Sequence, residues 1–236
     1  MNKSLTISIF ALLAISAFAT TWHKTEVPDP ISGEPTTVQN VNSYGSYIYR
    51  WPSKYDAVYW PFTDPNYIRF NAKSGYIAFG SDFEELETNK IEQITEFLKS
   101  NYKPNTSLTN HLDRLHWAEK VYSARGTDDK FYIRHYCLLS YLTRTDEQAS
   151  NKFRKQALDK IEDYLKTAKP SFYRSQLYIV AGFYSKLLGD DAKAENFWSS
   201  PERLKFDDAT TVDAMEYLEE ILKTIKNDEY KEKYYR

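Results

Sequence analysis

The spacing of apolar residues changes at about residue 84, and this change constrains the fold more than any other feature of the sequence. Beyond that point apolar side chains recur at intervals of three or four, which is the period of an amphipathic helix. The first stripe, Ile91 to Leu98, must end before Pro104, and the second ends at Gly126. From residue 84 onward the sequence therefore predicts a mainly α-helical fold.

Five further helices follow the same period. The third begins near Asp128, and Thr145 to Gln148 has the capping-box form expected at the start of the fourth. A fifth covers about residues 171–188 and turns through Gly189 into a sixth, and a seventh carries an apolar stripe from Val212 to Ile225. Because the loops are short, we expect stacked antiparallel hairpins. The last stretch, 226–236, is charged and is predicted to be a frayed end or a solvated helix.

The region before residue 84 is rich in Tyr, Trp, Pro and Gly and lacks helical spacing. Tyr67–Phe70 and Tyr76–Phe79 are short β-prone runs, and Gly75 between them can take a positive φ, so we predict a β-hairpin. We therefore expect two parts in the chain after residue 19. An aromatic-rich β and loop lobe covers residues 20–83, and a helical domain covers residues 84–236.

The first residues have the order of a cleavable signal peptide. Lys3 is followed by the apolar run Leu5 to Phe18, and Ala17 to Ala19 forms an A-x-A cleavage site. The run is too short to span a bilayer comfortably, and no second apolar stretch of spanning length follows. We expect residues 1–19 to be removed after Ala19, which would place a chain without a transmembrane segment in the periplasm or outside the cell.

Charge and reactive residues exclude several function classes. The formal net charge of −2 argues against nucleic acid, which needs a concentrated basic face. Cys137, the single cysteine, lies in an apolar setting and is expected to be a buried small hydrophobe rather than a reactive thiol. His135 is expected to be a hydrogen-bonded core histidine, and Asp82 to cap the turn into the first helix. With no metal, cofactor or catalytic constellation in the pattern, we favour a protein without enzymatic activity.

One predicted hairpin is similar to a tetratricopeptide repeat, whose pattern is W-x2-L-G-x2-Y…A-x3-F. Ser185 departs from it where an aromatic is usual, and Ala181 where leucine is usual. An ordinary helical hairpin with small contact residues is the alternative. The residues that carry the similarity are Tyr178, Gly182, Gly189, Ala194 and Trp198.

A second resemblance lies at the join of the two regions. Asp56–Tyr59, Tyr67–Phe79 and Asp82–Phe83 resemble a bacterial family of unknown function, which pairs a zinc-ribbon-like lobe with tetratricopeptide-type helices. Asn71 and Ser74 stand where that family has two cysteines. Asparagine and serine are poor zinc ligands, so the resemblance implies a lobe that has lost its metal and is held by its aromatic residues.

Aromatic residues crowd the stretch from 44 to 67, and four of them, Trp51, Tyr55, Tyr59 and Trp60, are candidate ligand-binding residues. The alternative is that these rings form the core of the lobe. The leading hypothesis is an exported, non-enzymatic binding or assembly protein whose helical scaffold takes a protein or peptide partner. The second is a carbohydrate-binding module or glycan-active enzyme that uses the aromatic lobe.

Overall fold

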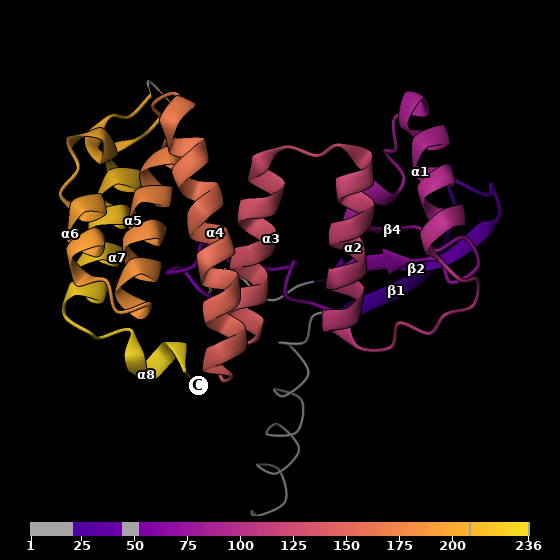
Figure 1. Cartoon of the computed structure of the whole chain (residues 1–236), viewed down its shortest axis with the longest axis horizontal. Coiled ribbons are helices and arrows are strands. Elements are labelled where there is room, and N and C mark those ends of the chain that lie inside the picture. The colour runs from indigo at the N-terminus through magenta and orange to yellow at the C-terminus, as the bar shows by residue number, and fades with distance from the viewer. Residues whose placement is uncertain (1–20, 44–51, 208, 236) are drawn as a thin grey trace, which may run out of the picture.

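The computed structural model describes residues 21–43, 52–207 and 209–235, and it confirms a mainly helical chain with a small β lobe (Figure 1). The elements follow one another in this order: strands β1 (Thr21–Pro28), β2 (Pro35–Ser43), β3 (Ile68–Phe70) and β4 (Ile77–Phe79), then helices α1 (Thr88–Asn101), α2 (His111–Arg125), α3 (Asp129–Leu142), α4 (Glu147–Thr167), α5 (Phe172–Leu187), α6 (Asp191–Trp198), α7 (Val212–Lys226) and α8 (Lys231–Tyr234). Among these helices none is both long enough and apolar enough to cross a membrane. The predicted signal peptide lies outside the described residues.

The β lobe consists of two antiparallel hairpins, β1 with β2 and β3 with β4. The second hairpin was predicted, and Gly75 takes the expected positive φ of +81°. The first was not predicted, and in it His23 pairs with Asn40. Most side chains of β1 are exposed and only Val27 is buried, so its sequence lacks a clear apolar alternation.

Successive helices pair as antiparallel hairpins, α1 with α2, α3 with α4 and α5 with α6. Their starts follow local capping chemistry, because the side chains of Asp128 and Ser171 accept hydrogen bonds from the first turns of α3 and α5. At α4 the predicted Thr145 cap is wrong. Asp146 caps this helix instead, its Oδ1 accepting from the Ala149 amide at 3.1 Å, since a carboxylate suits the positive end of a helix.

Two buried tyrosines anchor the chain after residue 226, contrary to the prediction of a frayed or solvated end. Tyr230 and Tyr234 are each 2% exposed and lie four residues apart, so both face the core. Their rings surround Phe183 of α5 at centroid distances of 5.0 and 5.4 Å. Arg144 holds this turn by donating from Nε to the Tyr234 carbonyl at 2.7 Å.

The start of α7 is more exposed to solvent than the sequence predicts. Val212 is 67% exposed although it begins the predicted apolar stripe, whereas Leu218, Leu222 and Ile225 are buried. The stripe is therefore covered from the second turn onward only.

The predicted repeat residues lie together in the α5–α6 hairpin. Gly182 faces Trp198 so closely that a Cβ at position 182 would lie 2.1 Å from the indole nitrogen, which donates to the Ile179 carbonyl. Ala194 is 1% exposed, Tyr178 is 8% exposed, and Gly189 turns the chain at φ +83°. This packing explains the small residues, while membership of a tetratricopeptide repeat stays a prediction.

We expect Gly182→Ala to lower the free energy of unfolding by about 1–3 kcal/mol, because the added methyl group must displace the Trp198 ring. Urea unfolding monitored by circular dichroism would measure this loss. In a Trp198→Leu background the same substitution should cost clearly less, and equal costs in the two backgrounds would contradict the close approach.

Candidate functional site

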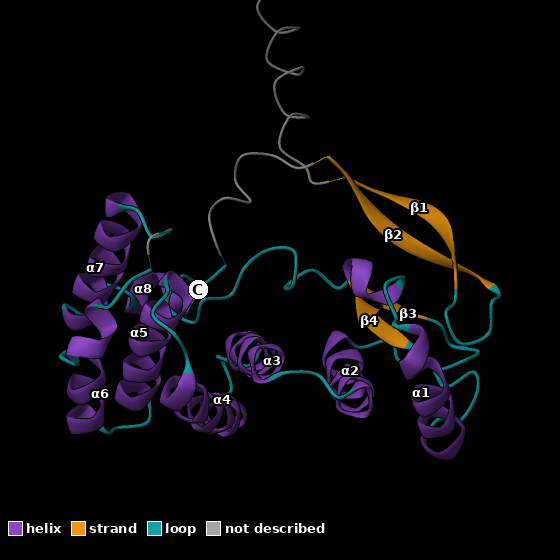
Figure 2. Cartoon of the chain, turned by 90° about the horizontal axis from the view of Figure 1, so that it is seen from above, coloured by secondary structure: helices purple, strands orange, loops and turns teal. Residues whose placement is uncertain are grey.

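Helices α2 and α3 lie in the middle of the molecule, are joined through Gly126 to Asp128, and their ribbons stand apart below that turn (Figure 1). Figure 2 shows that α1 and α4 project beyond α2 and α3 toward one side, so the four helices form an arc. A cavity of about 840 Å³ lies on this side. We call it the α2–α3 groove, and it is lined by Phe97, His116, Glu119, Lys120, Ser123, Ala124, Tyr132, Tyr136 and Lys152.

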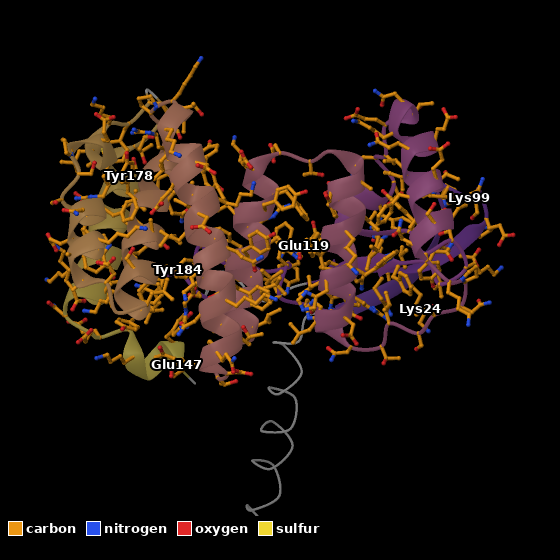
Figure 3. All side chains as sticks on the ribbon, in the orientation of Figure 1. Lys24, Lys99, Glu119, Glu147, Tyr178 and Tyr184 are labelled. Carbon is orange, nitrogen blue, oxygen red and sulfur yellow. The ribbon has the colours of Figure 1, made fainter. Side chains whose placement is uncertain are left out.

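Glu119 of α2 lies at the centre of the groove, between the two helices (Figure 3). The Tyr136 hydroxyl of α3 donates to Glu119 Oε1 at 2.6 Å. The Glu119 side chain is 28% exposed, so one part of the carboxylate is held by the protein and another part faces solvent. Burial and the neighbouring Glu119 raise the pKa of Tyr136, which therefore stays a hydrogen-bond donor.

His135 lies directly behind Glu119, with its Nε2 atom 3.9 Å from Glu119 Oε2. Its burial was predicted and is confirmed, since the residue is 2% exposed. The predicted hydrogen bond is wrong, because neither ring nitrogen has a partner. Burial lowers the pKa of His135 to about 3, so the imidazole is neutral near neutral pH and does not form an ion pair with Glu119.

Aromatic rings and lysines form the sides of the groove. Phe97 stacks on Trp117 at a centroid distance of 5.9 Å, which fixes the wall that α1 contributes. Across the groove Lys152 Nζ lies 5.7 Å from the centre of the Phe153 ring, and Lys120 Nζ lies 6.0 Å from that of Trp117. The groove therefore offers apolar faces, one central carboxylate and cations at its edge.

Sequence reasoning did not single out this site. Glu119 and Tyr136 are 17 residues apart on different helices, and no spacing rule connects them. The run of Trp117, Ala118 and Glu119 at the centre of one helix combines a large ring, a small residue and an acid, which could have indicated a binding surface. The sequence did not indicate which helix packs against it.

The predicted aromatic site is dispersed in the structure. Trp51 lies outside the described residues, and Tyr55 is 4% exposed and packs 5.7 Å from Phe183, which favours the core alternative for that ring. Tyr59 is half-buried and accepts a hydrogen bond from Gln176, and burial raises its pKa to about 12. Trp60 is half-buried 6.2 Å from Trp22 of β1, with the two rings tilted by 49°.

The positions of Tyr55 and Tyr59 affect the predicted domain boundary after residue 83. The segment from Ser53 to Tyr59 packs into the helical part although it precedes β3 in the sequence. The division into lobes at residues 20–83 and 84–236 therefore stays a prediction, and any such lobe would share its aromatic segment with the helices.

Asp56 is a fully buried carboxylate in that segment. Ser53 Oγ donates to its Oδ2 at 2.5 Å, and the Tyr234 hydroxyl donates to its Oδ1 at 3.1 Å. Burial raises the pKa of Asp56 to about 6, against the opposing effect of these hydrogen bonds. A cavity of about 230 Å³ separates this residue from Cys137, whose pKa burial raises to about 12. Cys137 is thus a protonated core thiol, as predicted.

Stability should depend on pH through Asp56. Its folded-state pKa of about 6 exceeds the ordinary 3.8, so the folded protein binds the proton more tightly than the unfolded chain and loses stability as pH rises through this window. On lowering the pH from about 7 to about 4, we expect the unfolding free energy of the wild type to rise relative to Asp56→Asn by on the order of 3 kcal/mol.

Urea unfolding of both proteins at the two pH values measures this shift. The comparison cancels other groups such as His135, whose lowered pKa acts in the opposite direction. A difference between wild type and variant that does not change with pH would contradict the buried position of Asp56.

Asn71 and Ser74, which stand where the resembled family has two cysteines, both donate hydrogen bonds to the carboxylate of Asp29. Asn71 Nδ2 donates to Asp29 Oδ2 at 2.6 Å and to Thr36 Oγ1 at 2.9 Å, and Ser74 Oγ donates to Asp29 Oδ2 at 2.7 Å. The described residues contain no cluster of three or more His, Cys, Asp or Glu arranged to hold a metal ion. Hydrogen bonds to buried Asp29 thus join the two hairpins, in addition to any packing of the lobe's aromatic residues.

Asp82 also has a role that differs from the predicted one. Its Oδ2 accepts from the Tyr122 hydroxyl of α2 at 2.6 Å, and the N-cap residue of α1, Glu87, makes no side-chain capping hydrogen bond. Asp82 therefore joins the β lobe to α2 and does not cap the first helix.

We expect Asp29→Ala to lower the free energy of unfolding by about 3 kcal/mol, because it leaves several donors of both hairpins without an acceptor. Glu34→Ala, in the same turn but exposed, should change it little. A zinc chelator should leave the wild-type transition unchanged, because amide and hydroxyl groups bind zinc poorly. A lower denaturation midpoint with chelator would contradict this account.

No family model, curated protein or solved structure matches this chain. The resemblance to the zinc-ribbon and tetratricopeptide family therefore rests on the residues quoted for it, and the functional argument rests on the groove.

Proposed function

We propose that this protein is a non-enzymatic binding protein whose α2–α3 groove takes a peptide segment of a partner protein. The observation that carries the proposal is the groove itself, a cavity of about 840 Å³ lined by four helices with Glu119 at its centre. In keeping with the N-terminal sequence, we propose that the protein acts after export, in the periplasm or outside the cell.

The size and lining of the groove support a peptide. Ligand sites of this class commonly enclose about 300–1,000 Å³ and combine apolar walls with a few fixed polar groups. Phe97, Tyr132 and Tyr136 offer aromatic surface for an apolar side chain of the partner, at a low entropic cost. Ser123 and Ala124 are small and leave room for the main chain between the walls.

The polar groups of the groove support recognition more than bond chemistry. Glu119 is oriented by the Tyr136 hydroxyl, so it can accept from a backbone amide or a basic side chain of the partner without rearranging. Lys120 and Lys152 at the edge can pair with acidic side chains that flank such a residue. His135 is neutral and enclosed behind Glu119, where it has no access to a bound chain.

The glycan alternative depends on the aromatic segment. Of its four candidate residues, Tyr55 has no face left for a sugar ring because it is buried. Trp60 and Trp22 are tilted by 49° and half-buried, so they do not form one flat platform. This arrangement gives weaker support to sugar stacking than the groove gives to a peptide.

The proposal is tested by capturing partners from the cell envelope and culture supernatant with the mature protein, and then measuring the affinity of a recovered peptide. We expect Tyr132→Ala and Lys152→Glu each to weaken binding about tenfold or more, since both residues line the groove. Lys223→Glu, the same charge change on exposed α7, should leave the affinity unchanged.

Two outcomes would contradict the proposal. One is a partner that binds all three variants with wild-type affinity, because the binding surface would then lie elsewhere. The other is binding to polysaccharide that is lost in Trp60→Ala and kept in Tyr132→Ala, which would favour the glycan alternative.

A further inference from the structure

Arg154 of α4 is a buried cation with incomplete hydrogen bonding. The residue is 2% exposed, and its Nη1 atom donates to Asn151 Oδ1 at 2.7 Å. The Nε and Nη2 atoms make no well-aligned hydrogen bond, because the neighbouring Tyr234 hydroxyl, which interacts with the guanidinium, donates its proton to Asp56. A guanidinium stays charged at any pH a protein meets, so it cannot relieve this state by losing a proton.

The neighbouring acid does not supply the missing acceptors. Asp56 is close enough to interact electrostatically with Arg154, but its oxygens accept from Ser53 and Tyr234 and no hydrogen bond from Nε or Nη2 of Arg154 reaches them. Leaving donors of a buried charged group unpaired costs free energy on the order of several kcal/mol. Such a group in a stable fold indicates a missing partner.

A cavity of about 480 Å³ borders Arg154, and a second arginine lines it. Three contacts hold the Arg144 side chain in place. Its Nε and Nη1 atoms donate to the carbonyls of Tyr234 and Tyr141 at 2.7 and 2.9 Å, and its guanidinium lies 4.2 Å from the centre of the Tyr141 ring. The remaining lining residues are Thr145, Glu147, Leu187 and Tyr235.

We propose that this cavity binds a small oxyanion, a carboxylate or phosphate group, between Arg144 and Arg154. Guanidinium groups match the planar and tetrahedral oxygens of such anions with paired hydrogen bonds. The two arginines outweigh the one lining acid, Glu147, so the net charge of the lining is positive.

Binding at this position would act on the C-terminal turn. Arg144 holds the Tyr234 carbonyl, and the Tyr234 hydroxyl holds Asp56, so an anion that fixes Arg144 also fixes the contact between α8 and the segment from Ser53 to Tyr59. A ligand that binds only the folded protein raises its unfolding temperature. The site is separate from the α2–α3 groove and does not depend on the function proposed for it.

The test measures the unfolding temperature of the mature protein against inorganic phosphate, acetate and chloride at constant ionic strength. We expect phosphate or acetate to raise it in a saturable manner and chloride to have no effect. Comparison of phosphate with acetate distinguishes a phosphate site from a carboxylate site. Half-saturation should move to at least about tenfold higher concentration in Arg144→Met and Arg154→Met.

Lys155→Met is the matched control, because it removes an adjacent exposed cation of the same helix and should respond as the wild type does. Arg144 is only partly buried, so Arg144→Met keeps the test informative if Arg154→Met does not fold. The proposal is overturned if no anion stabilises the wild type, or if Arg144→Met and the control respond equally.

Discussion

The buried carboxylate of Asp56 joins parts of the chain that are far apart in sequence. It accepts hydrogen bonds from Ser53 in its own turn and from Tyr234, which is 178 residues away in the C-terminal turn. The rings of Tyr55, Tyr230 and Tyr234 pack around Phe183 beside this contact. Because desolvating a carboxylate is costly, the contact is maintained only while both ends of the helical part are closed over it. The core of α3 to α8 therefore includes a segment that precedes the helices.

That arrangement explains why the molecule has a groove at its centre. The β hairpins, α1 and α2 form one end, held by Asp29 and by the Asp82–Tyr122 hydrogen bond, whereas α3 to α8 close around Asp56 (Figure 2). Each end has its own buried polar anchor, and α2 contacts α3 through the stacked rings of Tyr122 and Phe131 and the Tyr136–Glu119 hydrogen bond. The space left between them is lined by Glu119, Tyr132 and Tyr136 and is available to a ligand.

The helices could be predicted because their signals are local. Apolar spacing, Gly126 at a left-handed helix end and the caps Asp128 and Ser171 act within a few residues of where they stand. The first β-hairpin could not be predicted, because its strands are mostly exposed and polar.

The groove and the buried C-terminal turn were missed for another reason. They depend on contacts such as Glu119 with Tyr136 and Asp56 with Tyr234, which only the tertiary structure creates. The positions of the candidate aromatic residues could not be predicted for the same reason. Composition identified Tyr55 and Trp60 as unusual, but could not say that one lies in the helical core and the other beside β1.

The central functional claim is that a partner peptide lies between α2 and α3. Site-specific photo-crosslinking tests it most directly, with a photoreactive phenylalanine analogue placed at Tyr132 in the groove or at Val212 on the exposed start of α7. The account predicts that a bound partner crosslinks from position 132 and not from position 212. Crosslinks of equal yield from both positions, or a bound partner that crosslinks from position 212 alone, would contradict it.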